Sequence, residues 1–366
     1  MGNTGNFMWR GRYRRSVIVI AAVLCLLLWI ESDAIQNFLT KQKYGGGIVS
    51  GVGDDVTDTK LSKRRLRVLV HARMRTGSTL TARYIASNPD FFYVYEPGHM
   101  IIEYNDMDLS QDGFDYLERI RHELVDFMHS FLHCNFTGRD YFFKSINKNG
   151  FQRYFSNITH LDLPVREADV TAICRSKPHI ITKVNRLNNI LFASAVLKED
   201  DVKVIHLVRD PRGFANSRRS FRGFKDSKGG EHFTFPEKLE QDIRNYCTWL
   251  DTNYLPVKNS DSWFKENVML IRYEDLADWP EEIVPKMYTF VRLQRNTQIQ
   301  RLIKLSMKGK GQAWRLQVNI DEVKRIQDLC PDEVFRTFGY VKVHDEGQLR
   351  NTSISLVKPV TDVVNI

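Results

Sequence analysis

One short segment, Leu66–Leu80, constrains the fold of this chain more than any other stretch of its sequence. An apolar run that ends at Ala72 predicts a buried strand, and Ser78 opens a segment with the pattern of a helix. Between them lies a glycine-containing turn flanked by Arg73 and Arg75. Such a turn at a helix N-terminus is typical of an anion site, because backbone N–H groups and the helix dipole point at one place. We therefore expect this loop to hold a phosphate or a sulfate group.

The loop does not match the Walker A pattern of common ATPases and GTPases. That pattern requires a first glycine and a lysine directly after the second glycine, whereas Arg73 and Ser78 hold these positions. An ordinary capped helix after a strand is the alternative interpretation. Evidence from the rest of the chain is needed to distinguish an anion-binding loop from an ordinary capped helix.

Strand and helix patterns alternate along the rest of the chain. Further strands are predicted at Phe91–Tyr95, His179–Val184, Val202–Val208 and Val268–Tyr273. Helices are predicted at 112–133, 187–197, 211–217 and 236–257, and beyond residue 273 with a break at 309–311. The second strand is expected to complete a βαβ unit with the first. The alternation predicts an α/β fold, a P-loop-like doubly wound parallel sheet flanked by helices, with its ligand at the carboxyl ends of the strands.

Composition is compatible with one large domain. The chain has 366 residues, of which 42% are hydrophobic, which is enough for a substantial core. The net charge of +9 suits a polyanionic cofactor, an acidic polysaccharide, nucleic acid or an anionic membrane. No block of like charge is longer than Lys63–Arg65, so nucleic acid is not favoured as a partner.

An uncharged apolar run, Ser16–Ile30, lies near the N-terminus and is preceded by arginines. The run is short for a membrane span, but Arg15 can snorkel and the weakly polar residues after Asp33 can extend it. No small-x-small cleavage site follows, so we expect an uncleaved signal-anchor rather than a signal peptide. Basic residues before the run predict type II topology, with the body of the chain in the lumen.

The predicted layout follows from this anchor. It comprises a cytoplasmic tail (1–15), the transmembrane signal-anchor (16–33), a glycine-containing stem (34–65), the folded domain (66–345) and a C-terminal tail (346–366). Sequons that predict a luminal glycoprotein begin at Asn135, Asn157 and Asn351.

Cysteine usage also fits a luminal body. When Cys25 in the apolar run is set aside, the remaining cysteines are Cys134, Cys174, Cys247 and Cys330. An even number is compatible with two disulfides in an oxidising compartment, and their pairing is left open. No Cys-x-x-Cys pair is present and no histidine or cysteine cluster resembles a metal site, so no metal is predicted.

The residues that follow the predicted strands resemble a known family. The segments that carry the resemblance are Arg75–Leu80, Tyr95–Pro97, Val208–Arg212 with Ser217, Arg272–Leu276, and Cys330 with Phe338–Tyr340. In this order they are similar to the sulfotransferase family, closest to Golgi carbohydrate 6-O-sulfotransferases that act on N-acetylglucosamine or galactose. The resemblance covers roughly residues 66–340.

The resemblance implies an enzyme that uses 3′-phosphoadenosine 5′-phosphosulfate as its co-substrate. We expect it to transfer the sulfuryl group to a carbohydrate, most specifically to the 6-hydroxyl of N-acetylglucosamine or galactose, without a metal. The implied partner is a glycan or proteoglycan, and the implied location is the Golgi membrane. Protein tyrosine as acceptor, a homodimer, and a non-catalytic membrane-anchored binder of sulfated glycans are left open.

The resemblance also assigns binding residues. The first loop corresponds to the site of the 5′-phosphosulfate, which implies contacts from Arg73, Arg75, Thr76, Gly77, Ser78 and Thr79. Arg209 and Ser217 correspond to the pair that grips the 3′-phosphate. Lys308 and Gly309, with Trp314–Arg315, are similar to a glycine-rich loop for the same phosphate.

The predicted catalytic residues are Glu96, Lys183 and Arg75. Glu96 stands where sulfotransferases of heparan-type chains place a glutamate base, so we expect it to accept the proton of the acceptor hydroxyl. Its alternative role is an ion pair with Arg73 or Arg75. Lys183 resembles the lysine that contacts the sulfuryl group in soluble relatives. Those relatives carry a histidine where Asn185 stands here, which favours Glu96 as the base.

Sulfuryl transfer explains these residue types. Negative charge develops on the equatorial oxygens and on the leaving phosphate, so fixed cations and N–H donors supply most of the catalysis. Many relatives carry a lysine at the position of Arg75, which leaves open how the bridging oxygen is protonated. His99 is a second candidate base, whereas His71 and His206 are expected to be structural.

Overall fold

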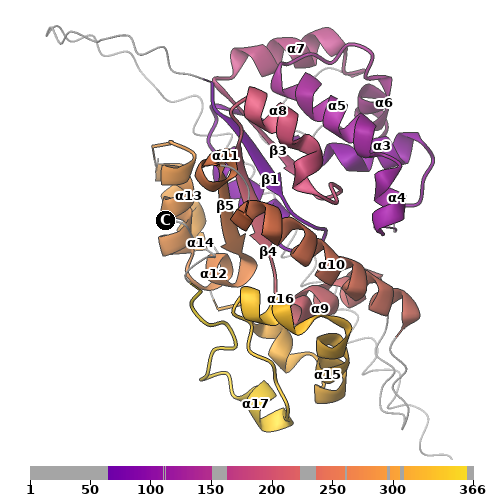
Figure 1. Ribbon diagram of the computed structural model, residues 1–366. Coiled ribbons are helices and arrows are strands. Elements are labelled where there is room, and N and C mark those ends of the chain that lie inside the picture. Colours follow the sequence, from indigo (N-terminus) through magenta and orange to yellow (C-terminus); the bar gives the residue numbers. More distant parts are fainter. Residues whose placement is uncertain are drawn as a thin grey trace, which may run out of the picture. The chain divides into compact units, whose positions relative to one another are not determined.

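Five parallel strands form the centre of the fold (Figure 1). In the computed structural model they are β1 (Arg67–His71), β2 (Phe91–Tyr95), β3 (His179–Val184), β4 (Lys203–Val208) and β5 (Val268–Arg272). They pair in the order β2-β3-β1-β4-β5. The predicted α/β class with a parallel sheet flanked by helices is confirmed. The two strands of the first βαβ unit, β1 and β2, are not neighbours in the sheet, because β3 lies between them.

The structure describes residues 65–109, 111, 113–150, 163–222, 236–259, 262–294, 297–305 and 309–360, which belong to one compact unit. The predicted cytoplasmic tail, the signal-anchor 16–33 and the stem up to residue 64 lie outside the described residues, as do Lys308 and Asn157. No helix within these ranges is both long enough and apolar enough to cross a membrane.

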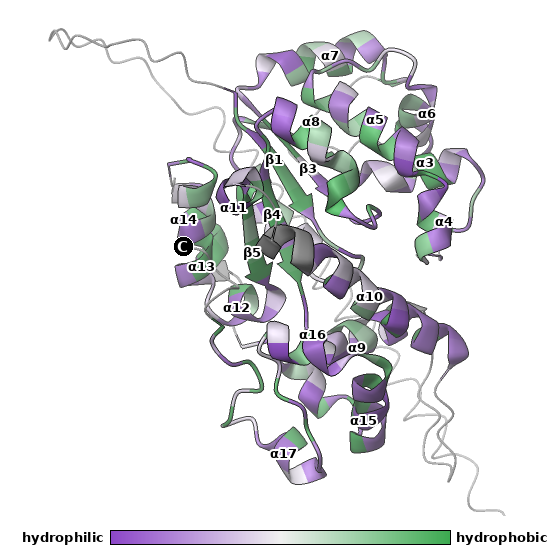
Figure 2. Cartoon of the chain, viewed as in Figure 1, coloured by the Kyte–Doolittle hydropathy of each residue, from purple (hydrophilic) through white to green (hydrophobic). Residues whose placement is uncertain are grey.

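Helices cover both faces of the sheet. One face packs on α3 (Pro97–Tyr104), α4 (Phe114–Glu118), α5 (Arg121–Leu132), α6 (Asp140–Asn149), α7 (Glu167–Ser176) and α8 (Ser194–Glu199). The other face packs on α2 (Ser78–Ala86), α12 (Tyr273–Asp278), α13 (Pro280–Phe290) and α14 (Thr297–Leu305). Alternate side chains of β1 serve the two layers, with Leu69 in the first core cluster and Val68 and Val70 in the second. Most residues of the strands are accordingly hydrophobic (Figure 2).

A third layer of helices packs beside the carboxyl ends of β4 and β5. It contains α9 (Pro211–Arg222), α10 (Glu237–Asn259), α15 (Ile320–Leu329) and α16 (Asp332–Thr337), while α11 (Ser262–Asn267) precedes β5. Its core includes Phe214, Trp249 and Phe335, together with Val208 and Leu270 from the strands. These helices form a platform next to the place where β4 ends.

The chain is folded beyond residue 345, where a tail is expected. After the short helix η3 (Ala313–Leu316) and the helices of the third layer comes α17 (Glu346–Arg350), whose Leu349 is fully buried. The buried guanidinium group of Arg315 donates hydrogen bonds to four carbonyl oxygens, those of Gln348, Leu349, Asn351 and Ile354. This arginine therefore holds the segment against the domain.

Several predicted helices have different bounds in the structure. The segment 112–133 contains two helices, α4 and α5, and the helix that begins at Pro211 continues past Ser217 to Arg222. The segment 187–197 becomes η2 (Ile190–Ala193) followed by α8. The helix starts late because the carbonyl of Leu187 accepts hydrogen bonds from the side chains of His71 and Trp249.

Two disulfides join helices of the domain. Cys134 pairs with Cys174 and Cys247 pairs with Cys330. The first bond connects the end of α5 to α7, and the second connects α10 to the residue after α15. The prediction of two disulfides is confirmed, and their pairing is now defined.

Candidate functional site

The loop after β1 forms a cradle at the carboxyl edge of the sheet. Thr76 Oγ1 donates a hydrogen bond of 2.7 Å to the carbonyl of Arg73, which closes the turn. Gly77 precedes α2 with φ 96°, and a Cβ at this position would lie 2.3 Å from Cδ2 of Tyr273. Only glycine fits there. The first turn of α2, which begins at Ser78, then presents N–H groups that have no partner within the helix.

Lys183 reaches this cradle from the neighbouring strand β3. Its Nζ donates to Thr79 Oγ1 at 3.2 Å and lies 3.7 Å from the centroid of the Tyr95 ring. The side chain is only 1% exposed, and burial lowers the pKa of Lys183 to about 8. A buried lysine with such a pKa, beside a helix N-terminus, is characteristic of functional sites.

Glu96 follows β2 and faces the same place. Its residue has φ 38°, a left-handed conformation that is uncommon outside glycine and is often found at functional sites. The buried carboxylate forms an ion pair with Arg186, accepts a hydrogen bond of 3.0 Å from Asn185 Nδ2, and lies 3.8 Å from Lys183 Nζ. Its ion-pair partners are thus Arg186 and Lys183, in place of the expected Arg73 or Arg75. Burial, and secondarily the charge of Arg73, lower the pKa of Arg186 to about 9.

Arg73 is held from the side of the helical layer. Its guanidinium group is 1% exposed, donates to Asn188 Oδ1 at 3.2 Å and lies 5.9 Å from the centroid of the Phe114 ring. Asn188 in turn donates to the carbonyl of Phe114 at 2.8 Å. The position of Arg73 is therefore fixed by the residues that follow β3.

Arg75, Arg209 and Ser217 meet at the other side of the loop. Arg75 Nε donates to Ser217 Oγ at 3.1 Å, and its guanidinium group lies 5.1 Å from the centroid of the Phe221 ring. Arg209 Nη1 donates to the carbonyl of Arg75 at 2.9 Å and stacks on Tyr273 at 4.3 Å. The arginine and serine after β4 are thus brought to the loop after β1, as the parallel sheet predicts.

The backbone of Arg209 is clamped by Tyr246. The tyrosine hydroxyl accepts from the N–H of Arg209 at 2.8 Å and donates to its carbonyl at 2.9 Å. Among the described residues, Nε of Arg209 is buried and has no hydrogen-bond partner. A Cβ at Gly213 would lie 3.1 Å from that Nε. The guanidinium group therefore retains an unused donor in a tightly packed position.

Buried polar residues that follow β4 and β5 support the site. Asp210 and Arg212 form a fully buried ion pair. Glu274 accepts from the N–H of Asp210 at 3.0 Å and from the hydroxyl of Tyr340 at 3.1 Å. Burial, together with the charge of Asp210, raises the pKa of Glu274 to about 8. These groups tie the ends of β4 and β5 to the C-terminal helices.

The expected glycine-rich phosphate loop is described only in part. Lys308 lies outside the described residues, and Gly309 has φ 74° with nothing within 4 Å of a Cβ placed there. Trp314 packs on the Arg212 guanidinium at 4.7 Å. Arg315, as noted above, binds backbone carbonyls and is structural.

The structure places three of the discussed histidines and two of the three predicted sequons. His71 and His206 are fully buried and lie 2.9 Å apart between their Nδ1 atoms, and burial lowers the pKa of both, that of His71 to about 4. Their expected structural role is confirmed. His99 lies half-buried in the first turn of α3. Asn135 and Asn351 are exposed, as a glycan would require.

Several residues of the site had no role assigned from the sequence, although Tyr95 and Tyr273 lie in segments that carry the family resemblance. The omitted side chains are Tyr95, Arg186, Asn188, Tyr246 and Tyr273. Arg186 and Asn188 come just after β3, and Tyr273 comes directly after β5. The rule that ligands lie at strand ends could have found these three. Tyr246 lies in the middle of α10, and no sequence signal marks it.

Comparisons with known proteins agree with this geometry. The model of the sulfotransferase family matches residues 68–297, well over half of the chain. Carbohydrate sulfotransferase 1 of Danio rerio is 24% identical over 95% of this chain and 98% of its own length. Carbohydrate sulfotransferase 3 of Tetronarce californica is 24% identical over 89% of this chain and 83% of its own.

A solved structure gives a weaker likeness. The sulfotransferase domain from the curacin biosynthetic pathway overlays with a TM-score of 0.38 at 15% identity, covering 74% of this chain and 95% of that one. The family model covers well over half of the chain, and its span of residues 68–297 includes the loop after β1, Glu96, Lys183, Arg209 and Ser217. The chain belongs to the sulfotransferase family.

Proposed function

We propose that this protein transfers the sulfuryl group of 3′-phosphoadenosine 5′-phosphosulfate to a hydroxyl group of a carbohydrate. One observation carries the proposal: Arg75 of the first loop bonds Ser217, and Arg209 bonds the carbonyl of Arg75. Two sets of anion-binding residues thus lie next to each other. The donor has two anionic ends, a 5′-phosphosulfate and a 3′-phosphate, and such a pair of adjacent sets suits it.

The residues present fit this donor. Gly77 leaves the loop open where any side chain would collide with Tyr273, and the buried Nε of Arg209 has no hydrogen-bond partner among the described residues. We assign the first turn of α2 and Lys183 to the phosphosulfate. Because Arg75 reaches Ser217, we assign Arg75 to the 3′-phosphate together with Arg209. Lys183 then becomes the cation nearest to the sulfuryl group.

The proposed reaction forms a bond between the acceptor oxygen and sulfur and breaks the bond between sulfur and the bridging oxygen of the donor. The proton of the acceptor hydroxyl passes to Glu96. Arg186 and Lys183 both form ion pairs with Glu96 and hold its carboxylate at the carboxyl ends of β2 and β3. Lys183 and the N–H groups of the loop stabilise the charge on the sulfuryl oxygens and on the leaving phosphate.

The acceptor is proposed from the relatives, whose names describe them as carbohydrate sulfotransferases. The finer proposal, the 6-hydroxyl of N-acetylglucosamine or galactose, rests on the resemblance of the sequence motifs. The test is transfer of radiolabelled sulfate to a panel of glycans in competition with a tyrosine peptide. Label in the glycan supports the proposal, and label in the peptide alone or in neither acceptor refutes it.

The proposed location is the Golgi membrane with the domain in the lumen. Support comes from the apolar run Ser16–Ile30 with the arginines before it, from the two disulfides and from the exposed sequons at Asn135 and Asn351. In sealed membrane vesicles, the domain is expected to resist added protease and to carry glycans that a glycosidase removes. Digestion of the domain in intact vesicles would contradict this topology.

A further inference from the structure

We propose that His129, His133 and Asp200 form a zinc site at the edge of the sheet opposite to the candidate functional site. One ligand atom from each of these residues lies within 4.8 Å of the others. No metal is predicted from the sequence, in which no histidine or cysteine cluster resembles a metal site, and Asp200 is distant from the two histidines along the chain. The fold brings it to them at the end of α8.

The two histidines have the spacing of a metal-binding pair. They stand four residues apart at the end of α5, which places them on one face of the helix. Their ring centroids are 4.6 Å apart. A His-x₃-His pair of this kind is a common part of zinc sites.

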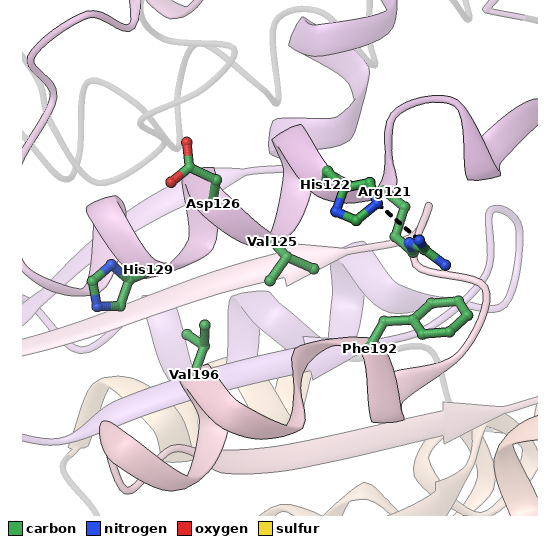
Figure 3. A pocket seen from close by; sticks show the side chains of 7 residues that line it. All are labelled: Arg121, His122, Val125, Asp126, His129, Phe192 and Val196. Atoms are coloured by element: carbon green, nitrogen blue, oxygen red, sulfur yellow. Dashed lines mark hydrogen bonds between the residues drawn. The ribbon is translucent and has the colours of Figure 1, made fainter.

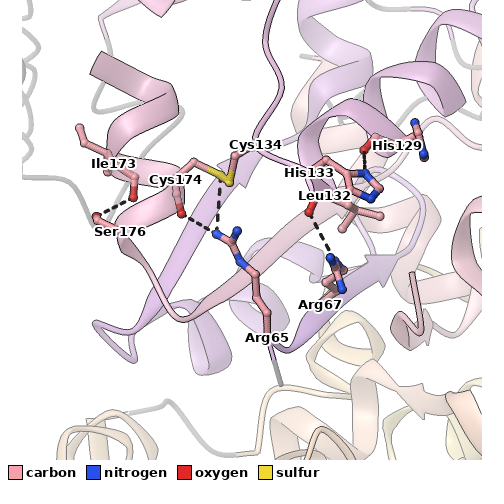
Figure 4. The surroundings of a disulfide bond; sticks show 9 residues. All are labelled: Arg65, Arg67, His129, Leu132, His133, Cys134, Ile173, Cys174 and Ser176. Carbon is pink, nitrogen blue, oxygen red and sulfur yellow. Dashed lines mark hydrogen bonds between the residues drawn. A yellow bond between two sulfur atoms is a disulfide. The ribbon is translucent and has the colours of Figure 1, made fainter. Parts of the chain in front are cut away.

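The ring of His133 is oriented as a metal ligand requires. Its Nδ1 lies 2.9 Å from the carbonyl oxygen of His129 and donates a hydrogen bond to it (Figure 4). Histidines that bind metals usually donate their other ring N–H to such an oxygen. In the neutral ring, Nε2 of His133 then carries the lone pair. This atom faces Asp200 Oδ1 at 3.1 Å, so two acceptors confront each other unless a cation or a proton lies between them.

That separation is close to the spacing of two zinc ligands. Ligands at about 2.0–2.1 Å from a tetrahedral zinc ion lie about 3.3 Å from each other. The burial of Asp200 also favours a bound cation. The residue is 4% exposed, and its Oδ2 is buried without a hydrogen-bond partner among the described residues. A desolvated carboxylate needs such compensation.

Arg67 provides the rival account of this cluster. Its Nε lies 3.6 Å from Asp200 Oδ1, which is an ion pair without a close hydrogen bond. The nitrogens of Arg67 also face the carbonyls of Leu132 and Asp200, both at 3.4 Å. In the rival account, Arg67 and a doubly protonated His133 hold Asp200 with no metal. The two accounts differ in whether the protein binds zinc.

The site is accessible and distant from the proposed chemistry. The side chain of His133 is 41% exposed, which gives a metal ion a path of entry. His129 also lines a surface pocket of about 510 Å³ between α5 and the η2–α8 segment (Figure 3). Arg67 is the first residue of β1, whereas the candidate functional site lies beyond the last residue of that strand. The zinc ion therefore joins the C-terminal ends of α5 and α8 and does not contact the donor.

The test uses the full-length protein, stripped with a chelator and titrated with Co²⁺ as a spectroscopic probe and then with Zn²⁺. We expect the visible absorption of tetrahedral Co²⁺, its displacement by one equivalent of Zn²⁺, and a zinc-dependent rise in Tm. His129→Ala removes a partly exposed ligand and is expected to weaken Co²⁺ binding by more than the about 10–100-fold typical of outer-shell losses. His122→Ala, on the same helix and lining the same pocket, is the matched control and is expected to bind normally.

Two results would overturn the proposal. The first is the absence of any Co²⁺ spectrum and of any zinc-dependent change in Tm in the wild-type protein, which leaves the ion pair with Arg67 as the account of Asp200. The second is an equal loss of binding in the His122 and His129 variants. Binding of 3′,5′-ADP is expected to be the same with and without zinc, so failure of this site and failure of the proposed function are distinguishable.

Discussion

Glu96 and Arg186 form a buried ion pair between the carboxyl ends of β2 and β3, with exposures of only 4% and 3%. If Glu96 is the base, Glu96→Gln preserves its shape and removes the proton acceptor. We expect kcat to fall by about 10²–10⁴-fold while binding of 3′,5′-ADP changes little. Steady-state kinetics and calorimetry measure the two quantities separately. Unchanged turnover would remove Glu96 from the mechanism and leave it a structural partner of Arg186.

The pKa of Lys183 predicts how activity depends on pH. Burial lowers this pKa to about 8, so the cation is present below that pH and is lost above it. Since the free enzyme needs the cation to bind and stabilise the sulfuryl group, kcat/KM is expected to fall as the pH rises through about 8. Lys183→Arg keeps its charge to much higher pH, so in this variant kcat/KM should fall only at a higher pH. A kcat/KM profile that stays flat well above pH 8 in the wild type would contradict the role of Lys183.

Gly77 is expected to tolerate no side chain. Gly77→Ala adds the strain of a left-handed alanine, about 1–2 kcal/mol, and a collision with Tyr273. Gly138→Ala is a matched control, because Gly138 has φ 73° with nothing within 4 Å of its Cβ. Urea unfolding should show a larger loss of stability for Gly77→Ala, and only this variant should lose 3′,5′-ADP binding. Equal effects would mean that Tyr273 does not constrain the loop.

Arg209 is expected to contribute directly to donor affinity. A hydrogen bond to a charged group is worth about 1.5–3 kcal/mol, so Arg209→Ala should weaken 3′,5′-ADP binding by about 10–150-fold. Ser217→Ala removes a weaker donor and should have a smaller effect. Arg301→Ala, at an exposed position of α14, is the control for the loss of one positive charge. Calorimetry that finds the same loss for Arg209 and Arg301 would point to general electrostatics in place of a specific contact.

The disulfide between Cys247 and Cys330 lies next to the clamp on Arg209, because Cys247 follows Tyr246 in α10. Replacing both cysteines by serine should cost about 2–5 kcal/mol of stability and also weaken 3′,5′-ADP binding. The same replacement at Cys134 and Cys174 should cost stability but leave that affinity intact, since this disulfide joins α5 to α7. Unfolding curves and calorimetry on the two double variants compare these outcomes. Equal affinity in both would show that the clamp does not depend on the disulfide.

Local patterns were sufficient to locate the strands, and β3 agrees with its prediction at both ends. Their order in the sheet was not predictable, because pairing of β3 between β1 and β2 depends on contacts between distant segments. The same limit applies to the site. Arg209 and Ser217 are marked by their motif, whereas the partnership of Glu96 with Arg186 arises only when β2 and β3 lie side by side.

The central claim is transfer of a sulfuryl group to a carbohydrate hydroxyl. Its most direct test incubates the full-length protein with radiolabelled 3′-phosphoadenosine 5′-phosphosulfate and glycans that end in N-acetylglucosamine or galactose. Matched 6-deoxy glycans and a tyrosine peptide are included as controls. The account predicts label in the intact glycans and none in the 6-deoxy glycans or the peptide. Label in the peptide alone, or in no acceptor, would contradict it.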